Sequence, residues 1–241
     1  MVNPQGVQII FFKFLSFRRI APVSVLLFLG ACAGLEEDHP VSRKFNWFGH
    51  LGGADIRAAC VAGAPERYRF VYNGIYVEQV RSYDILGTNA TAYHRLKVAV
   101  AEQADITDII TELARPDIFQ PWRPRIGSAI LSSETVRNMK SVLEGDDFFT
   151  SKPPERGISS IEFYWGVSAC LDGQFHYNAY IWPSDRFRNL AFPSLLKSWD
   201  KTKIAINSPR KASEYNVYGT YQQEEFRNYF TLHFDNQGVA R

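Results

Sequence analysis

This 241-residue chain lacks a large excess of either positive or negative charge, since its formal net charge is only +2. A dedicated nucleic-acid-binding protein concentrates excess Lys and Arg on one face, so we expect no nucleic-acid partner. Three cysteines are too few for a disulfide-built miniprotein or a multi-zinc scaffold. Charged residues make up 22% of the chain and hydrophobic residues 46%, which excludes a solvated, disordered tail and favours a folded domain with a sizeable core.

Motifs for catalysis and cofactor binding are also missing. The chain contains no G-x-S-x-G, H-E-x-x-H, Walker, G-x-G-x-x-G or EF-hand sequence. We therefore expect no cofactor and no metal site, and the sequence assigns no catalytic residue.

The N-terminal segment 1–31 differs in composition from the rest of the chain. Its only charges are Lys13, Arg18 and Arg19, and no acidic residue occurs before Glu36. Arg18-Arg19 precedes an apolar run of about ten residues, which is too short to cross a bilayer as a helix. The pattern predicts an export signal that is cleaved.

Directly after this run, Leu29-Gly30-Ala31-Cys32 places an apolar residue and two small residues before a cysteine. The segment resembles the bacterial lipoprotein lipobox, in which small side chains fit the signal peptidase and only a thiol can take the diacylglyceryl group as a thioether. The resemblance implies that Cys32 becomes the mature N-terminus and carries two or three acyl chains, such as palmitate, that anchor the protein in a membrane. Ala33 follows instead of Asp, which implies sorting to the outer membrane of the bacterial cell envelope, on its periplasmic face.

Two alternatives to the lipobox are open. An ordinary export signal can contain a cysteine by chance, and Arg18-Arg19 faintly resembles a twin-arginine signal.

Cys60 and Cys170 remain once Cys32 is acylated. An even pair in an oxidising compartment predicts a disulfide, and closing a loop of about 110 residues would contribute about 4 to 5 kcal/mol in the chain-entropy model. The alternative is two buried free thiols, because cysteine also behaves as a small hydrophobe. Neither cysteine lies in a C-x-x-C motif or at ligand spacing from a histidine.

Residues 32–46 are polar and lack apolar periodicity, so we predict a short tether between membrane and domain. Residues 47–241 are predicted to form a single α+β domain, with a mainly antiparallel sheet built from two hairpins and a few short helices. The proline-rich stretch 116–125 is interpreted as a surface loop within this domain, because a bridge between Cys60 and Cys170 would tie its two halves together.

The first predicted hairpin has its turn at Asn73-Gly74, between the strands 66–72 and 75–81. Asn-Gly is the strongest short hairpin signal, since a type I′ turn needs two residues with positive φ. This register pairs Arg69 with Glu78 and Glu66 with Arg81 across the strands, which is an ordinary sheet device rather than an anion site.

The second predicted hairpin turns at Asp172-Gly173, between residues 159–170 and 174–182. Its register places Trp165, Val167 and Ala169 on one face with His176, Asn178 and Tyr180. The other face is shared by Glu162, Tyr164, Ser168 and Cys170 with Phe175, Tyr177 and Ile181.

Other elements follow from local signals. The sequence predicts a helix at 54–61, a strand at 92–101, a helix at 133–143 capped by Ser133, a short helix at 193–199 and a last strand at 226–234. In the strand at 92–101, Tyr93, Arg95 and Lys97 alternate with the residues of the other face. Residues 105–114 are ambiguous between helix and strand.

Candidate functional residues are scattered. His94, His176 and Glu162 lie on predicted strands, and a sheet could gather them with Asp84 or Asp172 into an acid–base site. For each histidine, a hydrogen-bonded structural role is the simpler interpretation.

Two further features have a structural and a functional interpretation. Gly52-Gly53 beside His50 suits either a turn or an anion-binding nest. The 5 Trp, 12 Tyr and 18 Phe could line a groove for glycan or peptide, or simply fill an antiparallel sheet.

Two functional hypotheses remain. The first is a non-enzymatic, lipid-anchored envelope lipoprotein that binds or supports a periplasmic protein or a cell-wall component. The second is a hydrolase of cell-wall or exported polymers, which requires convergent titratable groups in a cleft.

Overall fold

The computed structural model describes residues 48–76, 78–87, 93–102, 124–211 and 231–234. Several sequence predictions concern residues outside these ranges: the export signal, the lipobox, the tether, the ambiguous segment 105–114, most of the proline-rich loop and residues 226–230 of the last strand.

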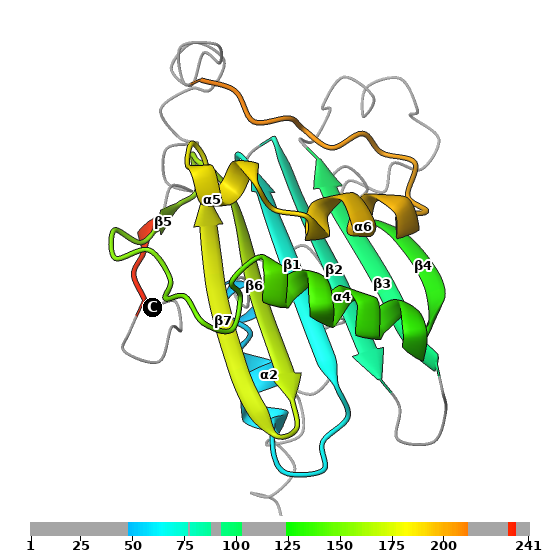
Figure 1. Cartoon of the computed structure of the whole chain (residues 1–241). Coiled ribbons are helices and arrows are strands. Elements are labelled where there is room, and N and C mark those ends of the chain that lie inside the picture. Colours follow the sequence, from blue (N-terminus) through cyan, green and yellow to red (C-terminus); the bar gives the residue numbers. More distant parts are fainter. Residues whose placement is uncertain (1–47, 77, 88–92, 103–123, 212–230, 235–241) are drawn as a thin grey trace, which may run out of the picture. The chain divides into compact units, whose positions relative to one another are not determined.

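Six strands form one antiparallel sheet in the order β4-β3-β2-β1-β6-β7 (Figure 1). Strands β1 to β4 are consecutive neighbours, and the β6–β7 hairpin joins them because β6 pairs with β1. A separate two-stranded sheet contains β5 and β8. The bounds are β1 Arg67–Gly74, β2 Gln79–Gly87, β3 Tyr93–Glu102, β4 Arg125–Ser132, β5 Ile158–Ser159, β6 Phe163–Leu171, β7 Gln174–Ile181 and β8 Thr231–Leu232.

The helices are few and short. They are α2 Ala54–Ala59, α4 Ser133–Gly145, α5 Asp185–Arg188 and α6 Phe192–Trp199, and a helical turn at 48–51 precedes α2. The described chain is therefore broadly α+β with β-structure dominating, which agrees with the mainly antiparallel sheet predicted from the sequence.

One face of the sheet is covered by α4 and α6. Val136, Met139 and Leu143 of α4, with Phe192 and Leu196 of α6, pack into the main hydrophobic cluster together with side chains from β1, β2, β3, β4, β6 and β7. These helix residues recur every three or four positions, so each helix presents one apolar stripe to the sheet.

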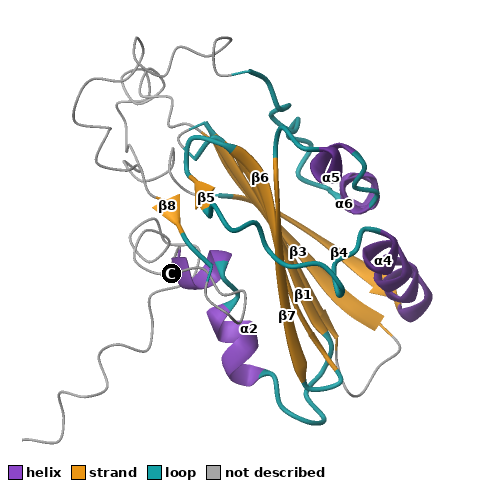
Figure 2. Ribbon diagram, turned by 60° about the vertical axis from the view of Figure 1, so that its left-hand side comes forward, coloured by secondary structure: helices purple, strands orange, loops and turns teal. Residues whose placement is uncertain are grey.

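Of the residues that the structure describes, those that cover the opposite face lie over part of its width. Leu51 of the helical turn and the small β5–β8 sheet form a second hydrophobic cluster over β1, β6 and β7. Helix α2 lies on this side too, against β6 (Figure 2). Because side chains alternate along a strand, the same strands supply both clusters.

The second hairpin has the predicted register. Trp165 lies opposite Tyr180 and Ala169 opposite His176, and the turn residues Asp172 and Gly173 both have positive φ, 51° and 75°. This prediction is confirmed, because two-residue turns with positive φ match the twist of the strands they join.

The first hairpin differs from its prediction, which is wrong about the turn. Strand β1 continues through Asn73 and Gly74 because both residues pair with β6, and Ile75 to Glu78 make the turn, with the Glu78 amide donating to the Ile75 carbonyl at 2.8 Å. Ile75 itself adopts a φ of 68° although it is β-branched, and its side chain is buried in the main cluster. Burial of Ile75 and pairing with β6 outweigh the local preference of Asn-Gly for a turn.

The corrected register replaces both predicted ion pairs of this hairpin. Arg69 lies opposite Asp84, and Arg81 opposite Tyr72. The carboxylate of Glu78 instead accepts from Arg210 Nη2 at 2.6 and 2.7 Å.

Arg81 anchors the extended segment that follows α6. Its side chain is 1% exposed and forms an ion pair with Asp200, while Nη2 donates to the Ile204 carbonyl at 2.9 Å. Asp200 also accepts from Tyr83 Oη at 3.1 Å. Burial would raise the pKa of the Asp200 carboxyl, but hydrogen bonds from Thr202 and the charge of Arg81 hold it below its usual value.

Several of the remaining elements differ from their predictions. Helix α5 and strand β5 were not predicted, β6 begins at Phe163 and not at 159, and only Thr231–Leu232 of the predicted last strand is a strand among the described residues. Helix α4 is capped by Ser132, whose Oγ accepts from the Thr135 amide at 3.1 Å, and not by Ser133. Strand β4 immediately before it was not predicted, because the sequence signals there were three prolines and a helix cap.

Candidate functional site

The acid–base groups identified in the sequence do not converge within the described residues. Asp84 of β2 faces the partly covered side of the sheet, whereas His176 of β7 packs edge-on against Phe149 on the helix side, with ring centroids 5.1 Å apart. Burial and the positive charge of Lys140 lower the pKa of His176. His94 of β3 has Nε2 3.8 Å from a Glu66 carboxylate oxygen. These positions favour structural roles for both histidines.

Glu162 and Asp172 lie in turns rather than in a cleft. Glu162 precedes β6 and accepts from Arg156 Nη1 at 2.7 Å and from the Ser159 amide at 3.2 Å. Asp172 is exposed in the β6–β7 turn. Neither carboxylate shares a hydrogen bond with Asp84 in the part of the chain that the structure describes.

The alternative of an anion-binding nest at Gly52-Gly53 has little support, because both amides already donate local hydrogen bonds. The Gly52 amide donates to the Phe48 carbonyl at 3.0 Å, and the Gly53 amide donates to the His50 carbonyl at 3.2 Å. A Cβ added to Gly53 would lie 2.5 Å from the Cβ of Ser168, so close approach to β6 is what requires glycine here. The structural interpretation of this pair is therefore the better one.

The large aromatic residues of the sheet fill the core and do not line a groove. The ring of Trp165 lies 4.8 Å from that of Tyr72 and 5.3 Å from that of Phe192, all inside the main cluster. Within the described residues the structural interpretation of the aromatic content therefore holds.

A groove of about 820 Å³ lies over β2, β3 and β4, on the sheet face opposite α4 and α6. Most of its lining is apolar, and the charged groups among the lining residues are Arg67, Asp84, Arg95 and Lys97. The apolar lining residues are Val80, Leu86, Leu96, Ala99, Ala101, Pro124, Ile126, Ala129 and Ile130. Both the volume and this mixture are typical of sites that take a small ligand.

Strand register orders the lining into cross-strand rows. The rows are Arg67–Leu86–Arg95–Ile130, then Arg69–Asp84–Lys97–Ser128, then Val71–Ser82–Ala99–Ile126, and beyond them Val80 opposite Ala101. Successive rows are about 6.7 Å apart, because they are two residues apart along each strand. The four charged lining groups therefore lie in the first two rows, the charged end of the groove, where Leu86 and Ile130 accompany them.

Arg69 lies beneath the charged end of the groove and binds two carboxylates there. Its side chain is 1% exposed, Nε donates to Asp84 at 2.8 Å, and Nη1 and Nη2 donate to the two carboxylate oxygens of Asp55 at 2.6 and 3.0 Å. Arg67 Nη2 lies 2.9 Å from Asp55 and 3.5 Å from Asp84. Two arginines and two aspartates thus form one network of ion pairs.

The network shifts the pKa of two of its members, Asp55 and Arg69. Burial alone would raise the pKa of the Asp55 carboxyl, but hydrogen bonds and charge from Arg69, with the charge of Arg67, hold it below its usual value. Burial would lower the pKa of Arg69, and the charges of Asp84 and Asp55 raise it instead. A buried charge is tolerated here because its donors are used in charge-assisted hydrogen bonds.

His50, Ser82 and Asp84 form a short polar chain at the middle of the groove. Ser82 Oγ donates to Asp84 Oδ2 at 3.3 Å and lies 3.0 Å from His50 Nε2. A serine nucleophile needs a histidine nitrogen that accepts its proton, with the carboxylate on the far side of that histidine. Here the carboxylate contacts the serine itself, so the arrangement does not activate Ser82.

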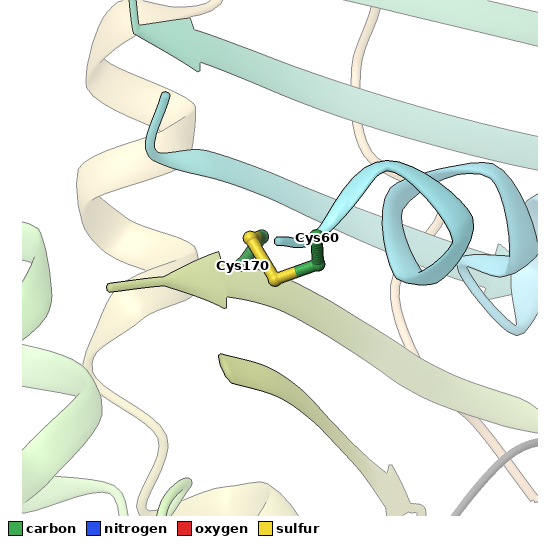
Figure 3. The surroundings of a disulfide bond; sticks show 2 residues. All are labelled: Cys60 and Cys170. Carbon is green, nitrogen blue, oxygen red and sulfur yellow. A yellow bond between two sulfur atoms is a disulfide. The ribbon is translucent and has the colours of Figure 1, made fainter. Parts of the chain in front are cut away.

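Cys60 follows α2, and Cys170 lies near the end of β6 (Figure 3). Their sulfur atoms are 1.96 Å apart and their Cα atoms 5.6 Å apart, a geometry compatible with the predicted disulfide. The bridge would hold α2, which carries Asp55, against the sheet. It therefore supports the charged network at the edge of the groove.

Comparison of the chain with protein-family models, with curated proteins and with solved structures finds no match in any of the three. Among the described residues, no cluster of three or more His, Cys, Asp or Glu side chains is arranged to hold a metal ion. The helices of the described ranges include none with the length and apolarity needed to traverse a bilayer.

Sequence reasoning did not identify Ser82, Arg95 or Lys97 as site residues. The available signal was the alternation in β3, which placed Tyr93, Arg95 and Lys97 on one face. What was missing was the position of β4 beside β3, because β4 was not predicted.

Proposed function

We propose that this chain is a lipid-anchored protein of the bacterial cell envelope, attached through Cys32 to the outer membrane on its periplasmic side, whose groove over β2–β4 binds an envelope component. The observation that carries the attachment is Leu29-Gly30-Ala31-Cys32, directly after an apolar run of export-signal length. The disulfide geometry of Cys60 and Cys170 supports an oxidising compartment such as the periplasm.

Binding is supported by the character of the groove. Its walls combine apolar side chains with the charges of Arg95 and Lys97, and Arg69 holds the floor in place through three short hydrogen bonds. A site of this kind selects a ligand by shape and charge without needing a reactive group.

The hydrolase alternative has weaker support. It requires a general acid and base within hydrogen-bond reach of one another, and His94, His176 and Glu162 are engaged in separate contacts among the described residues. Ser82 Oγ lies 3.0 Å from His50 Nε2, but it also donates to Asp84 at 3.3 Å, so the carboxylate contacts the serine and not the histidine.

The anchor is tested on the full chain, expressed in a Gram-negative host with and without Cys32→Ser. We expect the wild-type N-terminal peptide to begin at Cys32 and to carry diacylglyceryl and acyl masses, and the protein to sediment with outer membranes. The serine variant should lack those masses and lose this partitioning. A native N-terminus elsewhere, without fatty acid, would overturn the proposal.

The binding part of the proposal is tested by crosslinking in intact envelopes followed by purification of the full chain. Lys97→Glu should lose the crosslinked species, while Arg137→Glu, the same charge reversal on the exposed surface of α4, should keep it. Equal recovery with both variants would contradict binding in the groove.

A further inference from the structure

Strand β4 lies at one end of the described six-stranded sheet, with β3 on its inner side. In the described ranges, no backbone hydrogen bond joins the outer side of β4 to another segment. The strand is 8 residues long, contains no proline and has Arg125 as its single charged residue. Natural sheet edges are usually protected by charge, proline or a covering segment, so an edge of this kind is a template for pairing with another strand.

The opposite edge of the same sheet is protected. Asn178 of β7 donates from Nδ2 to the carbonyls of Phe148 and Ser151 at 3.3 and 2.9 Å, and its Oδ1 accepts from the Ala179 amide at 2.9 Å. The chain that follows α4 therefore lies against β7, and β7 is buried from Tyr177 to Ile181. Of the two ends of this sheet, β4 is the one that stands open in the described part of the chain.

The backbone groups of Ile126, Ser128 and Ile130 point away from β3. The Gly87 amide donates to the Glu66 carbonyl at 2.8 Å, which fixes which residues of β2 face β1. Backbone groups face alternate sides along a strand, so the continuous register from β2 through β3 to β4 sets their direction in β4 as well. These three residues therefore present their amides and carbonyls at the open edge.

The side chains of the same three residues lie on the groove face of the sheet. All three line the groove, and Ile126 and Ile130 are 47% and 65% exposed. A strand added beside β4 would cover these two large apolar side chains, and each Å² of apolar surface removed from water contributes about 25 cal/mol.

The sequence of β4 is nearly palindromic about Ser128. Gly127 and Ala129 flank the centre, and Ile126 and Ile130 lie one position further out. Two copies of the strand, antiparallel and with Ser128 opposite Ser128, place each isoleucine opposite the partner's isoleucine and small side chains opposite small ones. Each pair of outward-facing residues then exchanges two backbone hydrogen bonds, and the paired isoleucines stabilise the new ladder. A strand of an unrelated protein would match this pattern only by chance.

We propose that β4 pairs with β4 of a second copy of this chain, antiparallel about a two-fold axis at Ser128, to give a dimer with one continuous sheet. The interface is isologous, since both copies use the same strand. The partner's Ile126 lies beside Ile130 and extends the groove wall, so the grooves of the two copies meet at the dimer axis. The proposal depends neither on the lipid anchor nor on the ligand of the groove.

The register is tested by thiol crosslinking of the full chain in isolated envelopes, with a short bis-methanethiosulfonate reagent. Ser128→Cys should give a crosslinked dimer on non-reducing gels. Ile126→Cys and Ile130→Cys should each crosslink poorly alone, because the two copies of either residue are about 13 Å apart along the strands, and should crosslink well when the two variants are produced together. The wild type, which contains the three native cysteines, is the control.

Variants of the open edge test the assembly without a crosslinker. The full chain is extracted in detergent, and its mass is measured by sedimentation over a dilution series. Ile126→Lys/Ile130→Lys places like charges opposite one another, so we expect about half the wild-type mass. Ser128→Pro should have the same effect, because it removes an amide that faces the partner and not β3. Val61→Lys, which changes another apolar residue with 61% exposure, should remain dimeric.

Urea unfolding of the monomeric variants should show a native fold, since neither change touches the ladder between β3 and β4. Three results would overturn the proposal. The first is a wild type that sediments as a monomer throughout the dilution series. The second is an Ile126→Cys protein that crosslinks alone as well as in the mixture. The third is capture of a different polypeptide by Ser128→Cys in place of a second copy, which would assign the open edge to another protein's strand.

Discussion

Arg69 of β1 and Asp84 of β2 lie directly opposite one another, and the buried guanidinium donates from Nε to the Asp84 carboxylate at 2.8 Å. The remaining edge of the same guanidinium holds Asp55 of α2 through two hydrogen bonds. One side chain thus joins two strands and a helix beneath the charged end of the groove.

Replacement of Arg69 by Met should therefore be strongly destabilising. Met keeps most of the volume but leaves the carboxylates of Asp84 and Asp55 without their buried partner. We expect the free energy of unfolding to fall by about 3 kcal/mol, and no further, because half-exposed Asp55 can regain water. Arg69→Lys should recover only part of the loss, since one ammonium cannot replace a fork with two carboxylate partners. Urea unfolding measures both. Equal stability of Arg69→Met and wild type would show that the network contributes nothing.

The network should also make stability depend on acid pH. The pKa of Asp55 in the folded protein is below its ordinary value of 3.8, so the folded state binds a proton less readily than the unfolded chain does. The contribution of Asp55 to stability is fully present above its pKa in the unfolded chain, and it is lost as the pH falls through its pKa in the folded protein. We expect the urea concentration at the unfolding midpoint to decrease as the pH is lowered below about 4. Asp55→Asn, already less stable at neutral pH, should show a smaller decrease. Parallel curves for the two proteins would contradict this.

The predicted disulfide can be tested through stability and redox state together. Cys60→Ser/Cys170→Ser removes a cross-link between residues separated by 110 positions, and the chain-entropy model gives a loss of about 4 to 5 kcal/mol in unfolding free energy. A reductant should destabilise the oxidised wild type and leave the double variant unaffected. A wild type that responds to reductant no more than the double variant would favour two free thiols instead.

Asn73 distinguishes the observed first hairpin from the predicted one. Its buried Nδ2 donates to the carbonyls of Ser160 and Glu162 at 2.9 and 2.6 Å, so Asn73→Gly should lose two hydrogen bonds and about 2 kcal/mol. In a type I′ turn at Asn73-Gly74 the same change would cost almost nothing, because glycine suits that turn. Thermal or urea unfolding of Asn73→Gly separates the two cases.

The two hairpins show what sequence reasoning can and cannot supply. The Asp172-Gly173 turn was predictable because its determinants are the turn residues themselves. The turn at Ile75 to Glu78 was not, because it depends on the pairing of Asn73 with β6 and on the burial of Ile75 in a core that the local sequence does not reveal. Contacts between residues about ninety positions apart decide this register.

The site was predictable only along single strands. Alternation in β3 placed Arg95 and Lys97 on one face, and this is how the structure has them. The groove also needs β2 and β4 on either side of β3, and the sequence did not indicate β4. Arg69 was assigned the wrong carboxylate for a related reason, since its partners are set by sheet register and by the position of α2.

The proton positions between His50, Ser82 and Asp84 decide between the two functional hypotheses at this site. A serine hydroxyl has one proton, and the Asp84 carboxylate can only accept it, so Ser82 Oγ is an acceptor toward His50 Nε2, 3.0 Å away. Neutral His50 should then carry its proton on Nε2, which ¹⁵N NMR chemical shifts of the labelled imidazole report directly. Ser82→Ala should shift the Nε2 signal, while the network of Arg69 and Asp84 stays intact. An unprotonated Nε2 in the wild type would mean that Ser82 donates to the histidine, and in that case the hydrolase alternative would gain the activated hydroxyl that it lacks.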